Sequence, residues 1–176
     1  EQAGRQLGGG RRRGIGVPHV AVNLSASNFE NPNLLQDLQT VLRRRGLTAA
    51  DLMIEITEGI MLSTHAPVIE NLRAIQAAGF GISLDDFGTG FSGLSHLRRV
   101  PMDGVKIDRS FIADLMRDPD DLALTTAIIA MAHSLGITVV AEGIEKEGQY
   151  VILRERGCDL AQGYWLGHPM TAQEYA

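Results

Sequence analysis

Apolar residues along the chain gather in short runs rich in β-branched side chains, and longer stretches with helical periodicity separate these runs. Five runs predict strands, at residues 19–24, 52–57, 81–85, 104–108 and 138–142, and residues 160–166 form a weaker sixth candidate. Strands of this composition, separated by helical crossovers, are typical of a parallel sheet that is buried on both faces. The pattern therefore predicts an alternation of strands and helices.

Four of the stretches between the strands have a helical pattern, and each of these four ends at a glycine. The stripes are Leu34, Leu35, Leu38, Val41 and Leu42 before Gly46, Ile69, Leu72, Ile75 and Ala78 before Gly79, and Ile128, Ile129, Ala132 and Leu135 before Gly136, while the helix at residues 146–156 stops at Gly157. Glycine is favoured just past the end of a helix. The chain is therefore predicted to be an α/β protein, either an open doubly wound sheet or a closed barrel, and periodicity alone leaves both open.

Composition fits one ordinary globular domain. A length of 176 residues suffices for one substantial core and is short for two. The formal net charge of −5 provides no general basic field, so a DNA or RNA polymer is not an expected partner. The arginine triplets at residues 11–13 and 43–45 are interpreted as solvated helix faces, and the second suits the C-terminal dipole of its helix.

Cysteine usage and hydropathy bear on the compartment. The single cysteine, Cys158, cannot form an internal disulfide, which favours a reducing environment. No run approaches the roughly 20 apolar residues that span a bilayer, and the start of the sequence lacks the apolar core of a secretory signal. We expect a cytoplasmic location, with membrane tethering through regions outside this chain left open.

Polar side chains stand near the C-terminal end of every predicted strand. They are Asn23, Glu55, Asp85 with Asp86, Lys106 with Asp108, Glu142 and, on the weaker sixth strand, Gln162. A single carboxylate at a strand end is commonly a helix cap or half of an ion pair. In parallel β/α folds, however, these strand ends converge on one crevice or one barrel face. Because carboxylate and amide oxygens suit hard cations, the set predicts a site for Mg²⁺ or Mn²⁺.

The adjacent carboxylates Asp85 and Asp86 place a condition on this site. In a regular strand they would point to opposite faces, so both can serve one site only if the strand has ended there. Such a pair could bridge two cations about 3.5 to 4 Å apart, the arrangement that activates water in phosphate-ester cleavage. Lys106 could then orient the water or offset the charge that develops on the phosphoryl oxygens.

A competing motif follows directly. Residues Gly88, Gly90 and Gly93 match G-x-G-x-x-G after a predicted strand, as a dinucleotide-binding fingerprint requires. The two aspartates before it would repel a pyrophosphate without metals, and the acidic residue expected about 20 positions onward is not well placed. A nicotinamide-dependent oxidoreductase therefore ranks below the metal-dependent hydrolase.

Six segments, in order, resemble the signature segments of EAL domains. They are Val22-Asn23-Leu24-Ser25, Glu55-Ile56-Thr57-Glu58, Asp85-Asp86-Phe87-Gly88-Thr89-Gly90, Lys106-Ile107-Asp108, Ala141-Glu142-Gly143-Ile144-Glu145 and Gln162-Gly163-Tyr164. The resemblance implies a TIM-like (β/α) barrel whose first strand is antiparallel. It also implies hydrolysis of cyclic di-GMP to linear 5′-pGpG, with two divalent metal ions.

The resemblance also assigns roles to matching residues. The ligands of one metal ion are matched by Asn23, Glu55 and Asp85. Asp85 also matches a ligand shared with the second ion, which Asp86 serves. Lys106 matches the lysine that assists the attacking water, and Glu142 and Gln162 match further active-site positions. Glu58 matches the glutamate that anchors the loop beginning at Asp86, and Asp108 and Glu145 are candidates for substrate or indirect contacts.

The chain also departs from the family pattern. It contains no Glu-Ala-Leu segment, and the matching position would fall before Glu1. With about six of eight strands, residues 1–176 are expected to form the C-terminal portion of a single EAL domain with an incomplete barrel. A catalytically inactive cyclic-di-GMP receptor therefore stands as the alternative to an enzyme. The resemblance further implies a homodimer and upstream GGDEF or sensory domains as partners.

Overall fold

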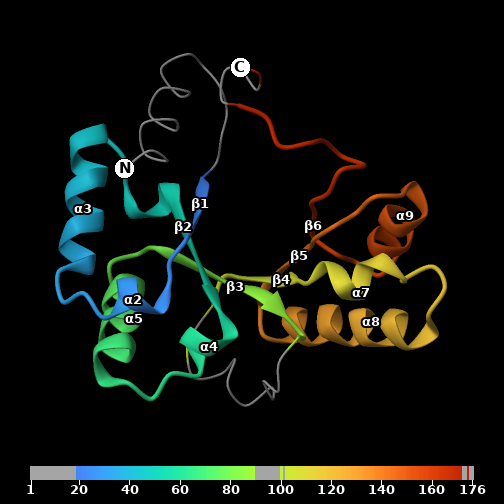
Figure 1. Ribbon diagram of the computed structural model, residues 1–176, viewed down its shortest axis with the longest axis horizontal. Coiled ribbons are helices and arrows are strands. Elements are labelled where there is room, and N and C mark those ends of the chain that lie inside the picture. The colour runs from blue at the N-terminus through green and yellow to red at the C-terminus, as the bar shows by residue number, and fades with distance from the viewer. Residues whose placement is uncertain (1–18, 90–99, 101, 172–173, 175–176) are drawn as a thin grey trace. The chain divides into compact units, whose positions relative to one another are not determined.

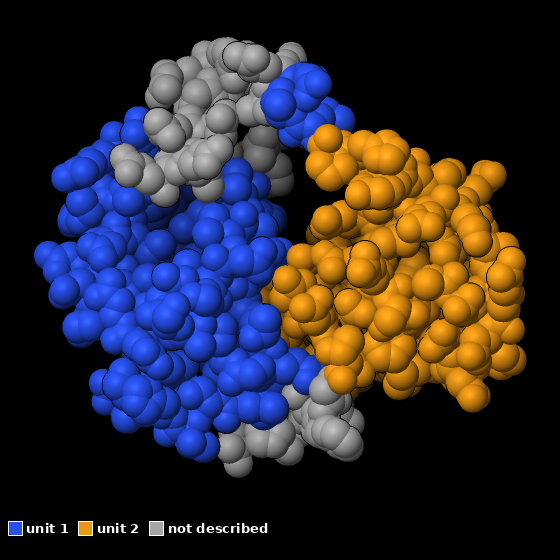
Figure 2. Space-filling view, in the orientation of Figure 1, with its two compact units in different colours: residues 1–82, 170–176 blue, residues 83–169 orange. Residues whose placement is uncertain are grey.

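The computed structural model describes residues 19–89, 100, 102–171 and 174, which fall into two compact units (Figures 1 and 2). The first unit comprises residues 1–82 and 170–176, and the second comprises residues 83–169. Every strand pairing within the two units is parallel. The predicted α/β alternation is therefore confirmed in the described part of the chain.

The described residues of the first unit contain a parallel pair of strands and four α-helices. Its elements are β1 (Val20–Asn23), α2 (Ala26–Phe29), α3 (Leu34–Arg45), a 3₁₀ turn (Ala49–Asp51), β2 (Leu52–Thr57), α4 (Glu58–Met61) and α5 (Ala66–Ala77). Phe29, Ile54 and Ile75 are fully enclosed. The buried Asn71 side chain on α5 donates to the carbonyl oxygens of Phe29 at 2.7 Å and Asn31 at 2.9 Å, which fixes the chain after α2.

The second unit carries a parallel four-stranded arrangement. Its elements are β3 (Gly81–Phe87, in this unit from Ser83 onward), β4 (Gly104–Ile107), α7 (Arg109–Ala113), α8 (Pro119–Ser134), β5 (Thr138–Ala141), α9 (Glu147–Glu155) and β6 (Leu160–Ala161). Strand β3 pairs with β4, β4 with β5 and β5 with β6. All residues of β4 are buried, and α8 packs against β4 and β5 (Figure 1). This strand therefore forms the centre of the unit.

The predicted helix ends are confirmed. Gly46, Gly79, Gly136 and Gly157, which follow α3, α5, α8 and α9, all have positive φ. Residues 43–45 form the last turn of α3, as the dipole argument expected. The triplet at residues 11–13 lies outside the described residues. No helix in the described part of the chain is both long and apolar enough to cross a membrane.

The strand bounds differ from the prediction by two or more residues at two places. Strand β6 comprises only Leu160–Ala161, although the apolar run extends to residue 166, because the backbone turns after Gln162. Strand β3 continues to Phe87, two residues beyond the predicted end, and this difference matters for the candidate site.

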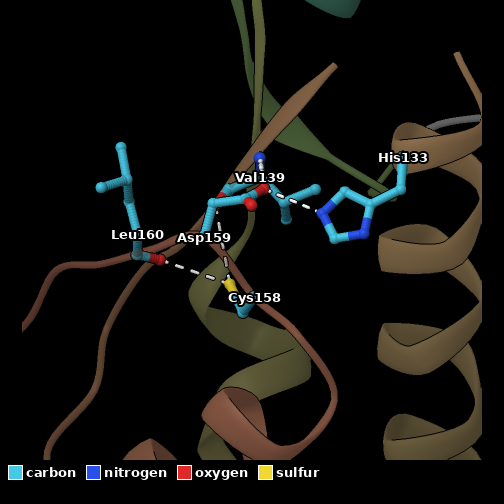
Figure 3. Close-up of polar contacts among 5 residues, drawn as sticks. All are labelled: His133, Val139, Cys158, Asp159 and Leu160. Carbon is cyan, nitrogen blue, oxygen red and sulfur yellow. Dashed lines mark hydrogen bonds and ion pairs between the residues drawn. The ribbon is translucent and has the colours of Figure 1, made fainter. Parts of the chain in front are cut away.

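The segment before β6 is held by Asp159 and Cys158 (Figure 3). One carboxylate oxygen of Asp159 accepts the backbone N–H of Val139 at 2.8 Å and lies 2.9 Å from Nε2 of His133. The Cys158 thiol donates to the carbonyl oxygen of Leu160 at 3.3 Å. Burial raises the pKa of Cys158 to about 11, so the thiol is protonated near neutral pH and acts as a packing group.

Candidate metal centre and adjoining pocket

A β-bulge in β3 brings the carboxylates of Asp85 and Asp86 close together. Leu84 pairs with Val105 and Phe87 with Ile107, so the two aspartates together oppose the single residue Lys106. Asp86 has a φ of 54°, a left-handed backbone that lets its carboxylate turn toward the side of Asp85. The expectation that the strand ends at Asp85 is therefore wrong, and a bulge within the continuing strand brings the two carboxylates together instead.

Three carboxylates from two strand ends form an acidic cluster in the second unit. Asp85 and Asp86 on β3 and Glu142, just after β5, offer oxygen atoms that all lie within 4.8 Å of one another. The ammonium of Lys106 on β4 lies 3.1 Å from Oδ1 of Asp85 and 2.6 Å from Oε1 of Glu142. Lys106 is only 8% exposed, so the cation is held among the carboxylates with little access to water.

The electrostatics of this cluster favour an added cation. Burial raises the pKa of Asp86, and the negative charges of Asp85 and Asp108 raise it further, although Lys106 opposes them. A single lysine therefore does not offset the local negative charge. Carboxylate oxygens at this spacing suit Mg²⁺ or Mn²⁺, so the residues present fit a divalent metal ion.

Two further predicted ligands lie together in the first unit. Asn23 and Glu55 are register partners at the C-terminal ends of β1 and β2, so their side chains share one face of that strand pair. The backbone continues this pairing, because the N–H of Leu24 donates to the carbonyl oxygen of Glu55 at 3.1 Å. Glu55 is 8% exposed, so its carboxylate is largely shielded from water.

A pocket of about 480 Å³ adjoins the acidic cluster within the second unit. Its lining comprises Asp86, Asp108, Arg109, Glu142, Gly143, Glu145, Gln162, Gly163 and Tyr164. The volume lies in the range of ligand-binding clefts. The predicted residues Asp86, Asp108, Glu142, Glu145 and Gln162 are therefore brought to one concave surface.

Gln162 reaches this pocket through backbone pairing beyond the end of β6. Its N–H donates to the carbonyl oxygen of Ala141 at 2.8 Å, and its own carbonyl oxygen accepts the N–H of Ile144 at 3.0 Å. A Cβ atom on the next residue, Gly163, would lie 2.2 Å from backbone atoms of Ile144. Only glycine therefore lets these two segments approach so closely.

Asp108 combines a pocket position with the capping role that a strand-end carboxylate often has. Its Oδ1 accepts hydrogen bonds from the backbone N–H and the hydroxyl of Ser110, which makes Asp108 the N-cap of α7. Burial alone would raise the pKa of Asp108, but these hydrogen bonds and the charge of Arg109 hold it below its usual value. Asp108 therefore carries a negative charge, and this charge acts on the nearby carboxylate of Asp86.

Two sequence motifs are only partly within the described residues. Glu58 begins α4 immediately after β2, but the loop it was expected to anchor continues into residues 90–99, which are outside the description. Residues 90 and 93 of the glycine motif also lie outside it. Gly88 has a structural reason of its own, because a Cβ atom there would come within 2.7 Å of the Phe111 ring.

Sequence reasoning missed Arg109, which lines the pocket, and Gln149, which holds the backbone of the lining residue Glu145. Gln149 on α9 is 2% exposed, and its amide oxygen accepts the N–H groups of Glu145 and Lys146, both at 2.9 Å. Its amide nitrogen donates to the carbonyl oxygen of Ile112 at 2.8 Å. Gln149 lies three residues after the N-cap Lys146, but a lysine N-cap lacks the acceptor side chain of a capping box, so the sequence offers no clear signal for this role.

The profile of the EAL domain family matches residues 1–169, and the chain belongs to this family. The bifunctional diguanylate cyclase/cyclic di-GMP phosphodiesterase MucR of Pseudomonas aeruginosa is 41% identical over 156 residues, which are 89% of this chain and 23% of MucR. A structure of the PaMucR phosphodiesterase in complex with cyclic di-GMP matches with a TM-score of 0.92 and 39% identity, covering 99% of this chain and 71% of that one. The manganese and cyclic-di-GMP complex of Klebsiella pneumoniae BlrP1 matches with a TM-score of 0.82 and 30% identity, covering 92% and 41%.

These likenesses confirm the fold class. The described strands and helices correspond to the TIM-like (β/α) barrel of EAL domains, with about six of its eight strands in this chain. The chain spans less than a quarter of the length of MucR. The assignment of residues 1–176 to the C-terminal portion of a single EAL domain stays a prediction.

Proposed function

We propose that the protein is a metal-dependent phosphodiesterase that hydrolyses cyclic di-GMP to linear 5′-pGpG. The observation that carries this proposal is the position of the Lys106 ammonium between Asp85 and Glu142 in an acidic cluster. The carboxylates of this cluster can hold divalent metal ions, and the ammonium beside them can offset negative charge on a phosphate ester. The name of MucR, with cyclic di-GMP and manganese in the related structures, supports this substrate and cofactor class.

The metal ligands in this proposal are the carboxylates and one amide. By resemblance to the EAL family, Asn23, Glu55, Asp85 and Asp86 are the residues that would hold two Mg²⁺ or Mn²⁺ ions. Bound divalent ions supply an activated water and neutralise charge on the phosphate. The bulge at Asp86 supports this role, because it turns two consecutive carboxylates to one side.

The remaining residues bind and orient the reacting groups. Water adds across one phosphodiester bond, so its oxygen joins phosphorus, the P–O3′ bond breaks and O3′ receives a proton. Lys106 orients the attacking water, and Glu142 and Gln162 position the water and the substrate beside it. Glu58 anchors the loop that begins at Asp86, and Asp108 and Glu145 line the substrate pocket.

The proposal also covers the oligomeric state, partner domains, location and ligand of the protein. By analogy with the family, the protein acts as a homodimer, beside GGDEF or sensory domains in its natural setting. Its proposed location is the cytoplasm, with or without a membrane tether elsewhere. Cyclic di-GMP, and no DNA or RNA polymer, is its proposed ligand.

The test combines turnover with binding for the natural full-length protein. Incubation with cyclic di-GMP and Mg²⁺ or Mn²⁺ is expected to yield 5′-pGpG, and Glu55→Ala is expected to abolish the product. Calorimetry on the same samples measures binding independently of turnover. Tight binding without product after prolonged incubation with either metal overturns the enzyme and identifies a cyclic-di-GMP receptor.

A further inference from the structure

The pocket beside the acidic cluster is strongly negative and carries one cation. Four carboxylates line it, those of Asp86, Asp108, Glu142 and Glu145, and Arg109 is the cationic residue of its described lining. Lys106, the other cation nearby, is already engaged by Asp85 and Glu142. Arg109 therefore supplies the positive charge that partly offsets the carboxylates of the described pocket lining.

Close packing fixes the base of the Arg109 side chain. A Cβ atom on Gly143 would lie 2.5 Å from Cβ of Arg109 and 3.3 Å from its Cα, and Gly143 has a φ of +73°. Glycine at this position therefore lets the segment after β5 press against the first residue of α7. The stem of Arg109 starts from a defined point on the pocket wall.

The head of the same side chain is free to bind a ligand. Arg109 is exposed, and its guanidinium makes no hydrogen bond or ion pair with the part of the chain that the structure describes. It acts on Asp108 through charge and helps to lower the pKa of that carboxyl. A guanidinium without a bidentate partner, at the edge of a pocket, is suited to a phosphate group.

We infer that Arg109 binds the phosphate of cyclic di-GMP that is not cleaved, an assignment that rests on the proposed function. The ligand carries two phosphates in one ring, and the reacting one belongs at the acidic cluster with Lys106. The second phosphate would otherwise face a wall of carboxylates, which repel it. Arg109 removes this repulsion by a charge-assisted, two-point contact.

A guanine edge is the other group that arginine could recognise, through O6 and N7. The pocket favours the phosphate, because Asp108 and Glu145 already offer carboxylate acceptors for the N–H groups of a guanine edge. Arginine is then needed for the one part of the ligand that these carboxylates reject. Arg109 is therefore a binding residue that lowers KM and leaves the chemical step to Lys106.

The test compares Arg109→Gln, Arg109→Lys and a matched control, Arg117→Gln, in the natural full-length protein. Arg117 is also exposed in the second unit and lies outside the pocket lining. Arg109→Gln is expected to raise KM for cyclic di-GMP about tenfold while kcat changes less than about twofold. Arg109→Lys is expected to recover only part of the affinity, because the ammonium keeps the charge but loses the two-point contact, and Arg117→Gln is expected to leave KM unchanged.

Two further readings distinguish phosphate from base. Raising salt from about 50 mM to about 300 mM is expected to weaken ligand binding by the wild type more than by Arg109→Gln. The reason is that salt screens the Arg109–phosphate contact, which the variant lacks. The preference for cyclic di-GMP over cyclic di-AMP is expected to stay the same, and its collapse in Arg109→Gln overturns the phosphate assignment. An unchanged KM, or a fall in kcat alone, also overturns it.

Calorimetry with cyclic di-GMP separates this inference from the proposed function. If the wild-type protein binds the ligand without turnover, the phosphodiesterase proposal fails, while Arg109→Gln still reports on the phosphate contact. Affinity about tenfold weaker in that variant supports Arg109, and equal affinity of the variant and wild type refutes it.

Discussion

The ammonium of Lys106 lies 2.6 Å from Oε1 of Glu142, a contact that joins β4 to the residue directly after β5. Asp85 on β3 approaches the same ammonium to 3.1 Å. Three neighbouring strand ends therefore meet at one buried cation. This geometry makes Lys106 responsible both for charge balance in the cluster and for the proposed orientation of water.

Replacement of Lys106 by glutamine should separate these two roles. The variant is expected to lose turnover by about 100-fold or more, because no cation remains to orient water and stabilise the phosphoryl oxygens. Its affinity for Mn²⁺ is expected to rise about tenfold, since the three carboxylates lose a competing positive charge. Calorimetry with Mn²⁺ alone measures the second effect. Weaker Mn²⁺ binding in Lys106→Gln would show that lysine supports the cluster in some other way.

The backbone at Asp86 gives a test of the bulge. Because asparagine tolerates a φ of 54° and alanine does not, Asp86→Asn should be more stable than Asp86→Ala by about 1 kcal/mol in urea unfolding. Both variants are expected to lose turnover with the carboxylate. The matched pair at the exposed Asp114, where φ is −105°, should differ by less than about 0.5 kcal/mol. Equal stability of the two Asp86 variants would argue against the left-handed backbone.

Gln149 should be essential for stability although it lies outside the proposed reaction. Gln149→Met leaves the N–H groups of Glu145 and Lys146 and the carbonyl oxygen of Ile112 without their partner, at a cost of about 2 to 4 kcal/mol. Chemical denaturation measures this loss, with Gln36→Met on the exposed face of α3 as a control that should change little. A Gln149→Met protein as stable as wild type would contradict the hydrogen-bonding pattern.

Asp159 should give a pH-dependent contribution to stability. Burial alone would raise its pKa, but the Val139 N–H and the His133 ring hold it below its usual value. A lowered pKa means that the charged form stabilises the fold above the unfolded-state pKa near 3.8. Asp159→Asn is therefore expected to cost about 1 kcal/mol near neutral pH, a value reduced for its exposure.

The same linkage predicts where the difference disappears. As pH falls through the lowered pKa of Asp159, wild type loses this contribution, so the stability gap to Asp159→Asn should close in acid. Thermal unfolding from neutral to acidic pH follows the gap, and Asp114→Asn is the control without these contacts. A gap that widens in acid would reverse the sign of the linkage.

Much of the fold could be predicted because each element has a local signal. The stripe that ends at Gly46 predicts α3 to its last residue, since apolar spacing and a left-handed glycine act within one segment. The limits of β6 could not be predicted, because its apolar run continues to Leu166. The hydrogen bond from the Gln162 N–H to Ala141, a distant partner, determines where the pairing ends.

The candidate site shows the same division. Its carboxylates could be found from their positions at strand ends, as Glu142 illustrates. The means by which Asp85 and Asp86 meet could not, because the bulge depends on the register with β4. Arg109 also escaped notice, since its place in the pocket follows from the packing of Gly143 against it rather than from any motif.

The most direct test of the central claim is product formation by the natural full-length protein, measured by chromatography with cyclic di-GMP as substrate. Asp85 belongs to the acidic cluster and pairs with Lys106, so Asp85→Asn removes both features at once. We predict 5′-pGpG from wild type with Mg²⁺ or Mn²⁺, none after chelation of the metal, and a loss of at least about 100-fold in Asp85→Asn. No product from wild type with either metal, or undiminished turnover by Asp85→Asn, would contradict the account.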